Sequence, residues 1–269
     1  MKVLVIPDLH CRKFWRKTIS DNIDRVEKVI FLGDYIDPYG DEIENNPETL
    51  ECEYYDDVYN ILQMLNDIIS LKKNNPNKYV LLCGNHTDSY IWSKFKASYG
   101  RTDYKNWEKY HKFFSQNLEY FNLVYIQDNM IFSHAGITNN WAYEFLDKYM
   151  EYDESALDGI SYVRECAEIL RDTPLKDFNI HYIKAISTIS HYRRGDDFYG
   201  SCEWADLYEH IDMQNSLKEK KIIPLGEEGI YQIFGHTQIK DLIFTSKWTC
   251  LDCKKGFIVD TLTHEITKC

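Results

Sequence analysis

The 269-residue sequence predicts an α/β fold, and three observations support this prediction. Short apolar runs rich in β-branched residues recur along the chain, and most of them end at polar residues. Longer stretches with helical periodicity lie between several of these runs, and strands that alternate with helices are typical of α/β layers. Hydrophobic residues make up 44% of the chain, which is enough for a sizeable core and argues against global disorder.

Five apolar runs have the length and composition of strands. They are KVLVI (2–6), KVIFL (28–32), YVLLC (79–83), MIFS (130–133) and YQIF (231–234). Residues 51–73 predict a helix, because apolar side chains recur there on one face at a spacing of about 3.6 residues. These side chains are Tyr55, Val58, Ile61, Leu62, Leu65 and Ile69. Further strands are expected within 247–253 and 256–268.

Residues 139–220 have a different character from the rest of the chain. Two segments in this stretch, 140–150 and 155–172, have helical patterns, and residues 191–210 are typical of a loop-rich segment. The stretch resembles an inserted cap more than part of a sheet. The sequence has no internal repeat and no linker rich in Pro, Gly or Ser. We therefore expect a single domain over residues 1–269, with a mainly helical insertion at about 139–220.

The chain is acidic, with a formal net charge of −12. This charge argues against a nucleic-acid partner, because non-specific binding to nucleic acid depends on Lys and Arg placed against phosphates. It does not exclude an anionic substrate, because bound metal cations can reverse the local field. Residues 92–114 mix aromatic and basic side chains. An amphipathic helix is the preferred interpretation of that segment, and a face that binds nucleic acid is the alternative.

The cysteines and the N-terminus bear on the cellular compartment. The first residues lead directly into a predicted strand and lack the pattern of a secretory signal. No apolar run approaches the roughly 18 residues needed to span a membrane. Eight scattered cysteines predict thiols, so we expect a cytoplasmic protein without a membrane partner. Cys250 and Cys253 have the spacing of half a zinc site, but buried strand cysteines are the preferred interpretation because no matching pair follows.

Polar residues that can bind a metal follow all five predicted strands. The motifs DLH, GDYID, GNH, SHAG and GHT supply Asp8, His10, Asp34, Asp37, Asn85, His86, His134 and His236. In open α/β sheets, ligands bind at the carboxyl ends of the strands. Divalent metals accept carboxylate, imidazole and amide oxygen ligands. The aspartates at 34, 37 and 41 form either a solvated acidic turn or part of a metal site, in which bound cations would neutralise them.

The order of these motifs resembles the calcineurin-like metallophosphoesterase superfamily. It is most similar to the serine/threonine protein phosphatase-like branch and its bacterial relatives, and the match runs from residue 6 to about residue 238. The resemblance implies a four-layer α/β/β/α sandwich with a helical cap insertion. It also implies a metal-dependent phosphoric ester hydrolase with two divalent metal ions. Manganese, iron and zinc would all accept these ligands.

The resemblance also implies a role for each motif residue. Six residues would bind the two metals: Asp8 and His10 the first, Asp34 as a bridge between both, and Asn85, His134 and His236 the second. His86 would donate a proton to the leaving oxygen, and Asp37 would orient its ring. The implied reaction is attack of a metal-bridging hydroxide on the phosphoryl group, which two metals can clamp and activate. A histidine held by a carboxylate is suited to the proton transfer.

The chain departs from the family pattern at several positions. Pro38 replaces the arginine that follows the second aspartate of the GDxxD motif and helps hold the phosphate. Arg193 and Arg194, in the segment HYRRGDD, are candidate substrate-binding residues, with a solvated surface pair as the alternative. Cys11 replaces a glycine, so its backbone could differ. Gln238 stands where many superfamily members have a histidine ligand, a departure shared by the protein phosphatase branch.

The leading interpretation of function is hydrolysis of phosphomonoesters, on a phosphoprotein or a small metabolite. The alternative is hydrolysis of a dinucleoside polyphosphate or another nucleotide, whose base could stack on aromatic residues of the cap. These residues are Tyr192, Phe198, Tyr199 and Trp204. His191 and His210 flank the predicted cap loop and could reach the site. A non-catalytic scaffold is a third hypothesis, and the complete set of motif residues argues against it. The oligomeric state stays open.

Overall fold

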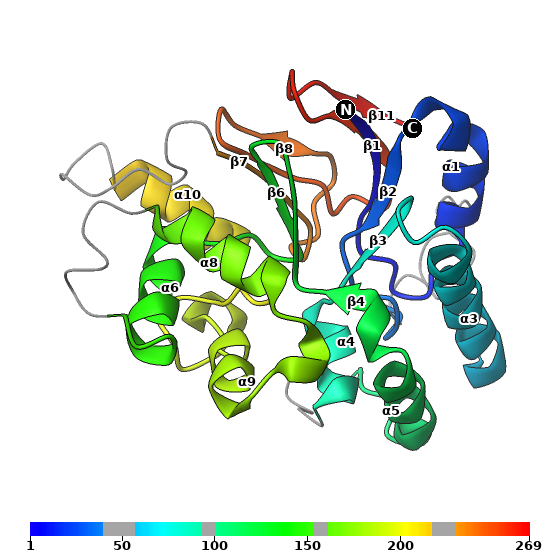
Figure 1. Cartoon of the computed structure of the whole chain (residues 1–269), viewed down its shortest axis with the longest axis horizontal. Coiled ribbons are helices and arrows are strands. Elements are labelled where there is room, and N and C mark those ends of the chain that lie inside the picture. Colours follow the sequence, from blue (N-terminus) through cyan, green and yellow to red (C-terminus); the bar gives the residue numbers. More distant parts are fainter. Residues whose placement is uncertain (40–56, 93–100, 153–160, 217–229) are drawn as a thin grey trace. The chain divides into compact units, whose positions relative to one another are not determined.

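The computed structural model describes residues 1–39, 57–92, 101–152, 161–216 and 230–269 (Figure 1). The chain divides into two compact units, each described separately below. The first unit comprises Met1–Phe121 and Lys254–Cys269, and the second comprises Asn122–Cys253. The α/β class is confirmed, because both units contain a sheet flanked by helices. The expectation of a single domain over the whole chain stays a prediction.

The first unit is built on a sheet with the strand order β11-β10-β1-β2-β3-β4. Its strands are β1 (Lys2–Ile6), β2 (Lys28–Phe31), β3 (Tyr79–Leu82), β4 (Phe121–Asn122), β10 (Phe257–Asp260) and β11 (Ile266–Lys268). β1, β2 and β3 are parallel, whereas β10 is antiparallel to both of its neighbours. The prediction for β1 is confirmed residue for residue, and those for β2 and β3 extend one residue too far.

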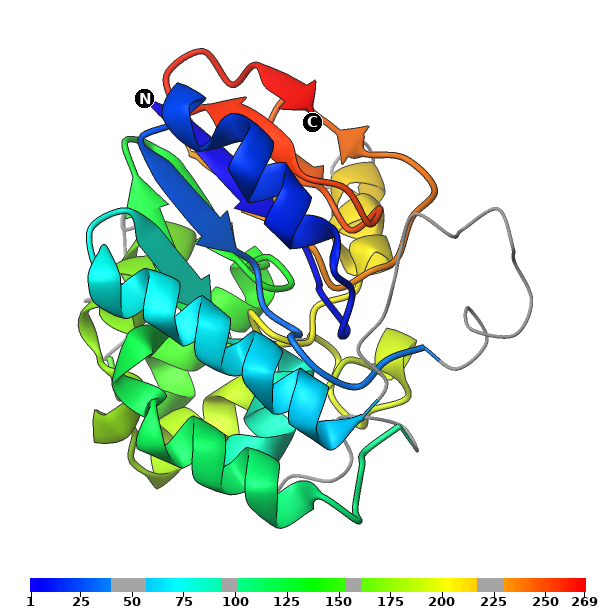
Figure 2. The same cartoon turned by 90° about the vertical axis from the view of Figure 1, so that its right-hand side faces the viewer.

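The helices of the first unit are α1 (Phe14–Asn22), α3 (Val58–Asn74), α4 (Asn85–Ile91) and α5 (Trp107–Gln116), with 3-10 turns at Ile23–Arg25 and Leu118–Tyr120. α1 and α3 lie on the same face of the sheet (Figures 1 and 2). Of the predicted amphipathic helix over 92–114, residues 93–100 lie outside the described part of the chain. Within the rest, the α5 helix begins only at Trp107, and residues 101–106 form non-helical backbone and turns.

The predicted helix over 51–73 corresponds to α3, whose first predicted residues, 51–56, lie outside the described part of the chain. The Asp57 side chain caps this helix, accepting hydrogen bonds from the backbone N–H groups of Tyr59 and Asn60. Its buried face contains Ile61, Met64, Leu65, Ile68 and Ile69. Burial of such side chains contributes about 1.5–3 kcal/mol each, which holds α3 on the sheet.

The second unit is built on a sheet with the order β5-β6-β7-β9-β8. Its strands are β5 (Val124–Gln127), β6 (Met130–Ser133), β7 (Tyr231–Phe234), β8 (Ile243–Phe244) and β9 (Trp248–Cys250). β6, β7 and β9 are parallel, and β5 and β8 run antiparallel at the two edges. The predictions for β6 and β7 are confirmed residue for residue, whereas β5 was not predicted.

The helices of the second unit are α6 (Asn139–Glu144), a π-helical turn (Phe145–Tyr149), α8 (Tyr162–Asp172), α9 (Ile180–Ile186) and α10 (Leu207–Ser216), with 3-10 turns at Leu175–Asp177 and His191–Arg193. All of them lie between β6 and β7 in the sequence, within the stretch predicted as a helical insertion. Residues 153–160 and 217–220 of that stretch lie outside the described part of the chain. α8 packs against β5.

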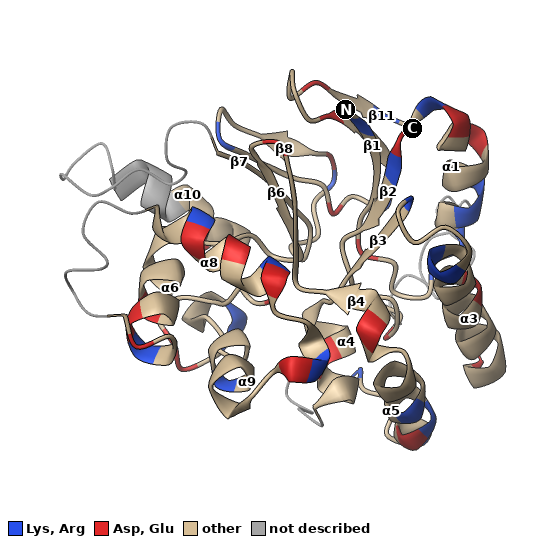
Figure 3. Cartoon of the chain, in the orientation of Figure 1, with Lys and Arg blue, Asp and Glu red and all other residues tan. Residues whose placement is uncertain are grey.

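Charged residues lie mainly on the helices and loops of each unit, and the strands carry few of them (Figure 3). Cys250 and Cys253 are both buried, as the sequence predicted, but only Cys250 lies in a strand, β9. The cysteines in the described ranges have free thiols. Among the helices described, none combines the length and the apolar character that crossing a bilayer requires.

His210, which the sequence suggested could reach the site, belongs to the core of the second unit. Its ring is fully buried and stacks on Phe234, with ring centroids 4.7 Å apart. Its Nε2–H donates to the carbonyl oxygen of Ala135 at 3.1 Å. Gly136 has a φ of +84°, and a Cβ at this position would lie 2.7 Å from the His210 ring. The glycine therefore permits both the turn after β6 and the close approach of the imidazole.

We predict that His210→Gln weakens the pH dependence of stability. Burial lowers the pKa of His210 to about 4 in the folded chain, whereas the unfolded chain titrates near about 6.5. Between these values the unfolded state binds more protons, so stability falls as the pH drops from about 6.5 to about 4. The part due to His210 should be on the order of 3 kcal/mol.

Urea unfolding across this pH range measures the difference between the wild type and His210→Gln. His181→Gln is the control, because this histidine is exposed on α9. Identical pH dependence in the wild type and His210→Gln would contradict the prediction.

Candidate active site

The loops after β1 and β2 in the first unit are joined by backbone hydrogen bonds. β1 and β2 are parallel neighbours, so their carboxyl ends lie at the same edge of the sheet. The N–H of His10 donates to the carbonyl of Asp34 at 2.7 Å, and the N–H of Cys11 donates to that of Tyr35 at 2.9 Å. Two of the predicted motifs, DLH and GDYID, are thereby brought together.

Positive φ angles concentrate in these two loops. His10 has a φ of 43°, Cys11 of 65°, Asp34 of 45° and Asp37 of 63°. Non-glycine residues seldom adopt this backbone, which costs about 1–3 kcal/mol for each residue and persists where the surroundings enforce it. Cys11 therefore keeps the left-handed conformation that suits the glycine of the family pattern. Such strain is typical of functional sites.

The His10 ring presents one nitrogen that could bind a metal. Its Nδ1–H donates to the carbonyl oxygens of Ile36 and Asp37 at 3.1 and 3.0 Å. Its Nε2 therefore carries the lone pair, and it faces the Asp34 carboxylate at 3.5 Å. Burial lowers the pKa of His10 well below its usual value, so the ring is neutral. A neutral imidazole fixed by a carbonyl is the form in which histidine ligates metals.

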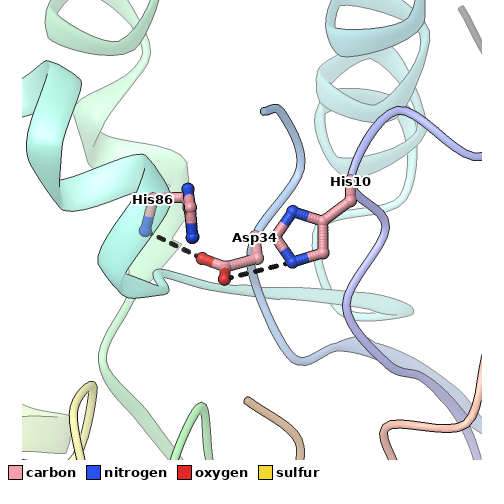
Figure 4. Close-up of side chains that lie close together, drawn as sticks. All are labelled: His10, Asp34 and His86. Carbon is pink, nitrogen blue, oxygen red and sulfur yellow. Dashed lines mark hydrogen bonds and ion pairs between the residues drawn. The ribbon is translucent and has the colours of Figure 1, made fainter. Parts of the chain in front are cut away.

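The Asp34 carboxylate lies between His10 and the start of α4 (Figure 4). One of its oxygens faces His10, and the other accepts the backbone N–H of His86 at 2.9 Å. Ligand atoms of His10, Asp34 and His86 lie within 4.8 Å of one another, as a metal site requires. All three residues are buried. The donor set of imidazole and carboxylate fits a divalent transition metal.

His86 differs from His10 because both of its ring nitrogens already have partners. Its Nδ1 lies 2.8 Å from Asp37 Oδ2, and its Nε2 accepts from Arg101 Nη2 at 2.8 Å. The hydroxyl of Tyr90 donates to the other Asp37 oxygen at 2.6 Å. Asp37 is thus held on both sides and orients the ring. An imidazole oriented by a carboxylate can transfer a proton at its other nitrogen.

Tyr90 and Arg101 belong to this arrangement, and sequence reasoning missed both. Burial, with the charge of Asp37 as a second cause, raises the pKa of Tyr90, so its hydroxyl stays protonated and donates. The spacing could have identified Tyr90, because it follows His86 by four residues in α4 and so shares its helical face. No local sequence pattern could have identified Arg101, because it lies 15 residues after His86.

The other predicted residues of the first unit are buried near these loops. Asp8 is fully buried just after β1, and its carbonyl accepts from the Arg12 guanidinium at 3.1 Å. Asn85 is the first residue of α4 and is also buried. Burial, with the charge of Asp37 as a second cause, raises the pKa of the Cys11 thiol. Cys11 is therefore a thiol and a poor nucleophile, as expected of a passive residue.

The second unit brings the remaining two predicted histidines together. His134 follows β6 and His236 follows β7, and these parallel strands are neighbours. His134 Nε2 and His236 Nδ1 lie 3.1 Å apart, and both residues are buried. The N–H of Gly235 donates to the carbonyl of His134 at 2.7 Å, which fixes the two loops relative to each other. His236 has a φ of 66° and shows the same type of backbone strain as the loops of the first unit.

The predicted substrate-binding arginines have different surroundings. Arg193 pairs with Asp206 at 2.5 Å and donates to the Thr237 hydroxyl at 2.6 Å, next to His236. Arg194 is exposed and ends the 3-10 turn with a φ of 61°. Their role in binding substrate stays a prediction. Among the other cap residues, Trp204 is buried with its ring 5.9 Å from that of His236, whereas His191 and Gln238 are exposed.

Comparison with known proteins identifies the family. The family model described as calcineurin-like phosphoesterase matches residues 1–242. The chain belongs to this family. The phosphoesterase is therefore a phosphoric ester hydrolase, and the predicted resemblance is confirmed. No curated protein matches its sequence.

Solved structures resemble the phosphoesterase at low identity. A cold-active protein tyrosine phosphatase solved at 1.1 Å has a TM-score of 0.55 and 14% identity, covering 99% of this chain and 78% of that one. A mutant of a cold-active protein tyrosine phosphatase has a TM-score of 0.54 and 13% identity, covering 99% and 80%. A protein serine/threonine phosphatase from Saccharomyces cerevisiae has a TM-score of 0.47 and 13% identity, covering 100% and 79%.

We predict that Tyr90→Phe lowers turnover of the phosphoesterase by about tenfold or more, because a hydrogen bond to a charged group contributes about 1.5–3 kcal/mol. The substitution removes the donor that holds Asp37, which in turn orients His86. The loss should be larger for phenyl phosphate than for p-nitrophenyl phosphate, because only the poorer leaving group needs full protonation. Tyr110→Phe is the matched control, since this buried ring packs on Tyr90 at 5.3 Å. Equal losses for both variants would contradict the prediction.

Proposed function

We propose that this phosphoesterase hydrolyses phosphomonoesters at a centre of two divalent metal ions. The observation that carries the proposal is the pair of differently held histidines in the first unit. The Nε2 of His10 faces a buried carboxylate as a ligand would, whereas His86 is oriented by Asp37 as a proton donor would be. A phosphomonoester needs both functions, because the phosphoryl charge must be neutralised and the leaving oxygen must be protonated.

The metal ligands in this proposal are the six residues that the strand-end motifs supply. Asp8 and His10 would hold the first ion, Asp34 would bridge the two ions, and Asn85, His134 and His236 would complete the second. The buried His134–His236 pair supports the second set, because two imidazole nitrogens meet there at 3.1 Å. Manganese, iron and zinc all suit these donors. When bound, two such metals activate water and stabilise the attacking and leaving oxygens of the displacement.

The chain's own residues handle the proton. Once Nε2 is released from its bond to Arg101, His86 would bind a proton from water at this nitrogen and give it to the leaving oxygen, while its Nδ1–H stays bonded to Asp37. Tyr90 keeps the Asp37 carboxylate in place on its far side. The substrate in this proposal is a phosphoprotein or a small phosphorylated metabolite. The cytoplasmic location expected from the cysteine pattern stays a prediction.

A dinucleoside polyphosphate or another nucleotide is the second candidate substrate. The observation that favours it is aromatic exposure in the cap, where Phe198 is 79% and Tyr192 41% exposed. Exposed aromatic faces can stack on a nucleobase. A panel containing a phosphopeptide, a sugar phosphate and diadenosine tetraphosphate separates the two candidates. Preference for diadenosine tetraphosphate by kcat/KM would favour the second.

We expect about two metal ions per chain and turnover of p-nitrophenyl phosphate, as a dinuclear hydrolase requires. Elemental analysis of the purified protein measures the first, and hydrolysis assays with and without added Mn²⁺ measure the second. Asp34→Asn should lower metal content as well as rate, because the carboxylate serves both ions. A chain that holds no metal and shows no turnover with any divalent ion would instead support the scaffold hypothesis.

We also predict that His86→Asn lowers kcat roughly a hundredfold or more on phenyl phosphate, the typical contribution of a general acid. The loss on p-nitrophenyl phosphate should be much smaller, because that leaving group is stable without a proton. Comparison of the two kcat ratios is the measurement. The proton-donor role is wrong if the substitution slows both substrates equally.

A further inference from the structure

The residue after Asp37 leaves a chemical gap in the site. Pro38 occupies the position at which the family pattern has a phosphate-holding arginine. A phosphoryl group carries negative charge on several oxygens, and arginine matches that geometry with paired N–H donors. Another cationic group beside His86 would therefore be expected to provide this function.

Arg101 has the position that this function requires. Its Nη2 lies 2.8 Å from His86 Nε2, the nitrogen at which a proton would be transferred. Its Nη1 donates to the carbonyl oxygen of Asp37 at 3.3 Å. Its guanidinium carbon lies 3.8 Å from the ring centroid of Tyr39, the residue after Pro38. The guanidinium is thus anchored on the same loop from which the family arginine would extend.

The Arg101 guanidinium retains unused hydrogen-bonding capacity. It has five N–H donors. Two of them serve His86 and Asp37, and the other three have no partner among the residues that the structure describes. The side chain is only partly buried, so these donors can reach a ligand. Arg12, the other arginine near the Tyr39 ring, is fully buried and is therefore less accessible to a ligand than Arg101.

We propose that Arg101 binds the phosphoryl group of the substrate next to His86, in place of the arginine that Pro38 replaces. This inference rests on the proposed phosphoesterase function. Tyr39 and the Asp37 carbonyl hold the guanidinium, and the phosphoryl oxygens accept its N–H groups. When the substrate binds, Arg101 exchanges its bond to His86 Nε2 for a phosphoryl oxygen. The Nε2 is then open to the leaving oxygen, which lies on the same phosphorus atom.

Two substitutions at Arg101, each in the metal-loaded protein, test the proposal. Arg101→Gln should raise the KM for p-nitrophenyl phosphate and the inhibition constant of inorganic phosphate by about 10- to 100-fold, because a hydrogen bond to a charged group contributes about 1.5–3 kcal/mol. Arg101→Lys should recover part of the affinity, since it keeps the charge but loses the paired geometry. Added guanidinium ion should partly restore the affinity of Arg101→Gln for substrate and phosphate.

Three controls make the result specific. Arg16→Gln removes an exposed arginine that pairs with Asp67 and should leave both constants unchanged. Arg193→Gln tests the arginine expected from the sequence. Circular dichroism and elemental analysis show whether each variant keeps its fold and its metals. If Arg101→Gln does not fold, the inhibition constant of inorganic phosphate for Arg101→Lys, measured without added guanidinium ion, still tests whether Arg101 binds the phosphoryl group.

The outcomes separate the inference from the function on which it rests. If Arg101→Gln and Arg101→Lys lower only kcat and leave phosphate inhibition unchanged, Arg101 merely positions His86 and the inference is wrong. The inference would also be wrong if Arg193→Gln raised the inhibition constant of phosphate tenfold and Arg101→Gln left it unchanged. If the wild type shows no turnover with any divalent ion, the proposed function fails. Calorimetric titration of the metal-loaded wild type and Arg101→Gln with inorganic phosphate would then still test the Arg101 site.

Discussion

The site of the first unit depends on one constraint, the strained loop that follows β2. This loop turns through Asp34 and Asp37 with positive φ at both residues. The turn directs one carboxylate toward His10 and the other toward His86. A relaxed extended loop would not present both side chains this way, because residues spaced by three in extended backbone point to opposite sides. Hydrogen bonds to the β1 loop and burial of the whole segment offset the strain.

Two histidines of identical chemistry have different hydrogen-bond partners in this loop. The loop's carbonyl oxygens engage Nδ1 of His10, which leaves Nε2 as the only nitrogen able to bind a cation. The loop's carboxylate engages Nδ1 of His86, which polarises the ring for proton transfer. The acceptor at Nδ1 is thus what separates the proposed metal ligand from the proposed acid: neutral carbonyl oxygens at His10 and the charged Asp37 carboxylate at His86. The fold supplies both acceptors within a single short loop.

Sequence patterns predicted the parts of this protein that local chemistry determines. β1, β6 and β7 were predicted residue for residue, because each is a short apolar run that ends at a polar motif. The edge strand β5 was missed because its VYIQ segment is only partly buried and gains its structure by pairing with β6. Tyr90 and Arg101 were missed for a similar reason. Their roles arise from contacts with Asp37 and His86 that only the folded chain creates.

Local charge explains how an acidic protein can accept an anionic substrate. The net charge of −12 would repel phosphate at long range, but screening limits that effect to about 10 Å in ordinary salt. Within the first unit, Arg12 and Arg101 lie 5.5 and 3.8 Å from the same Tyr39 ring. Burial is the main cause that lowers the pKa of His10, and these two guanidinium groups act in the same direction. The positive field of these two guanidinium groups thus adds to burial in favouring the neutral His10 ring, and a field of this sign also favours an anionic phosphoryl group nearby.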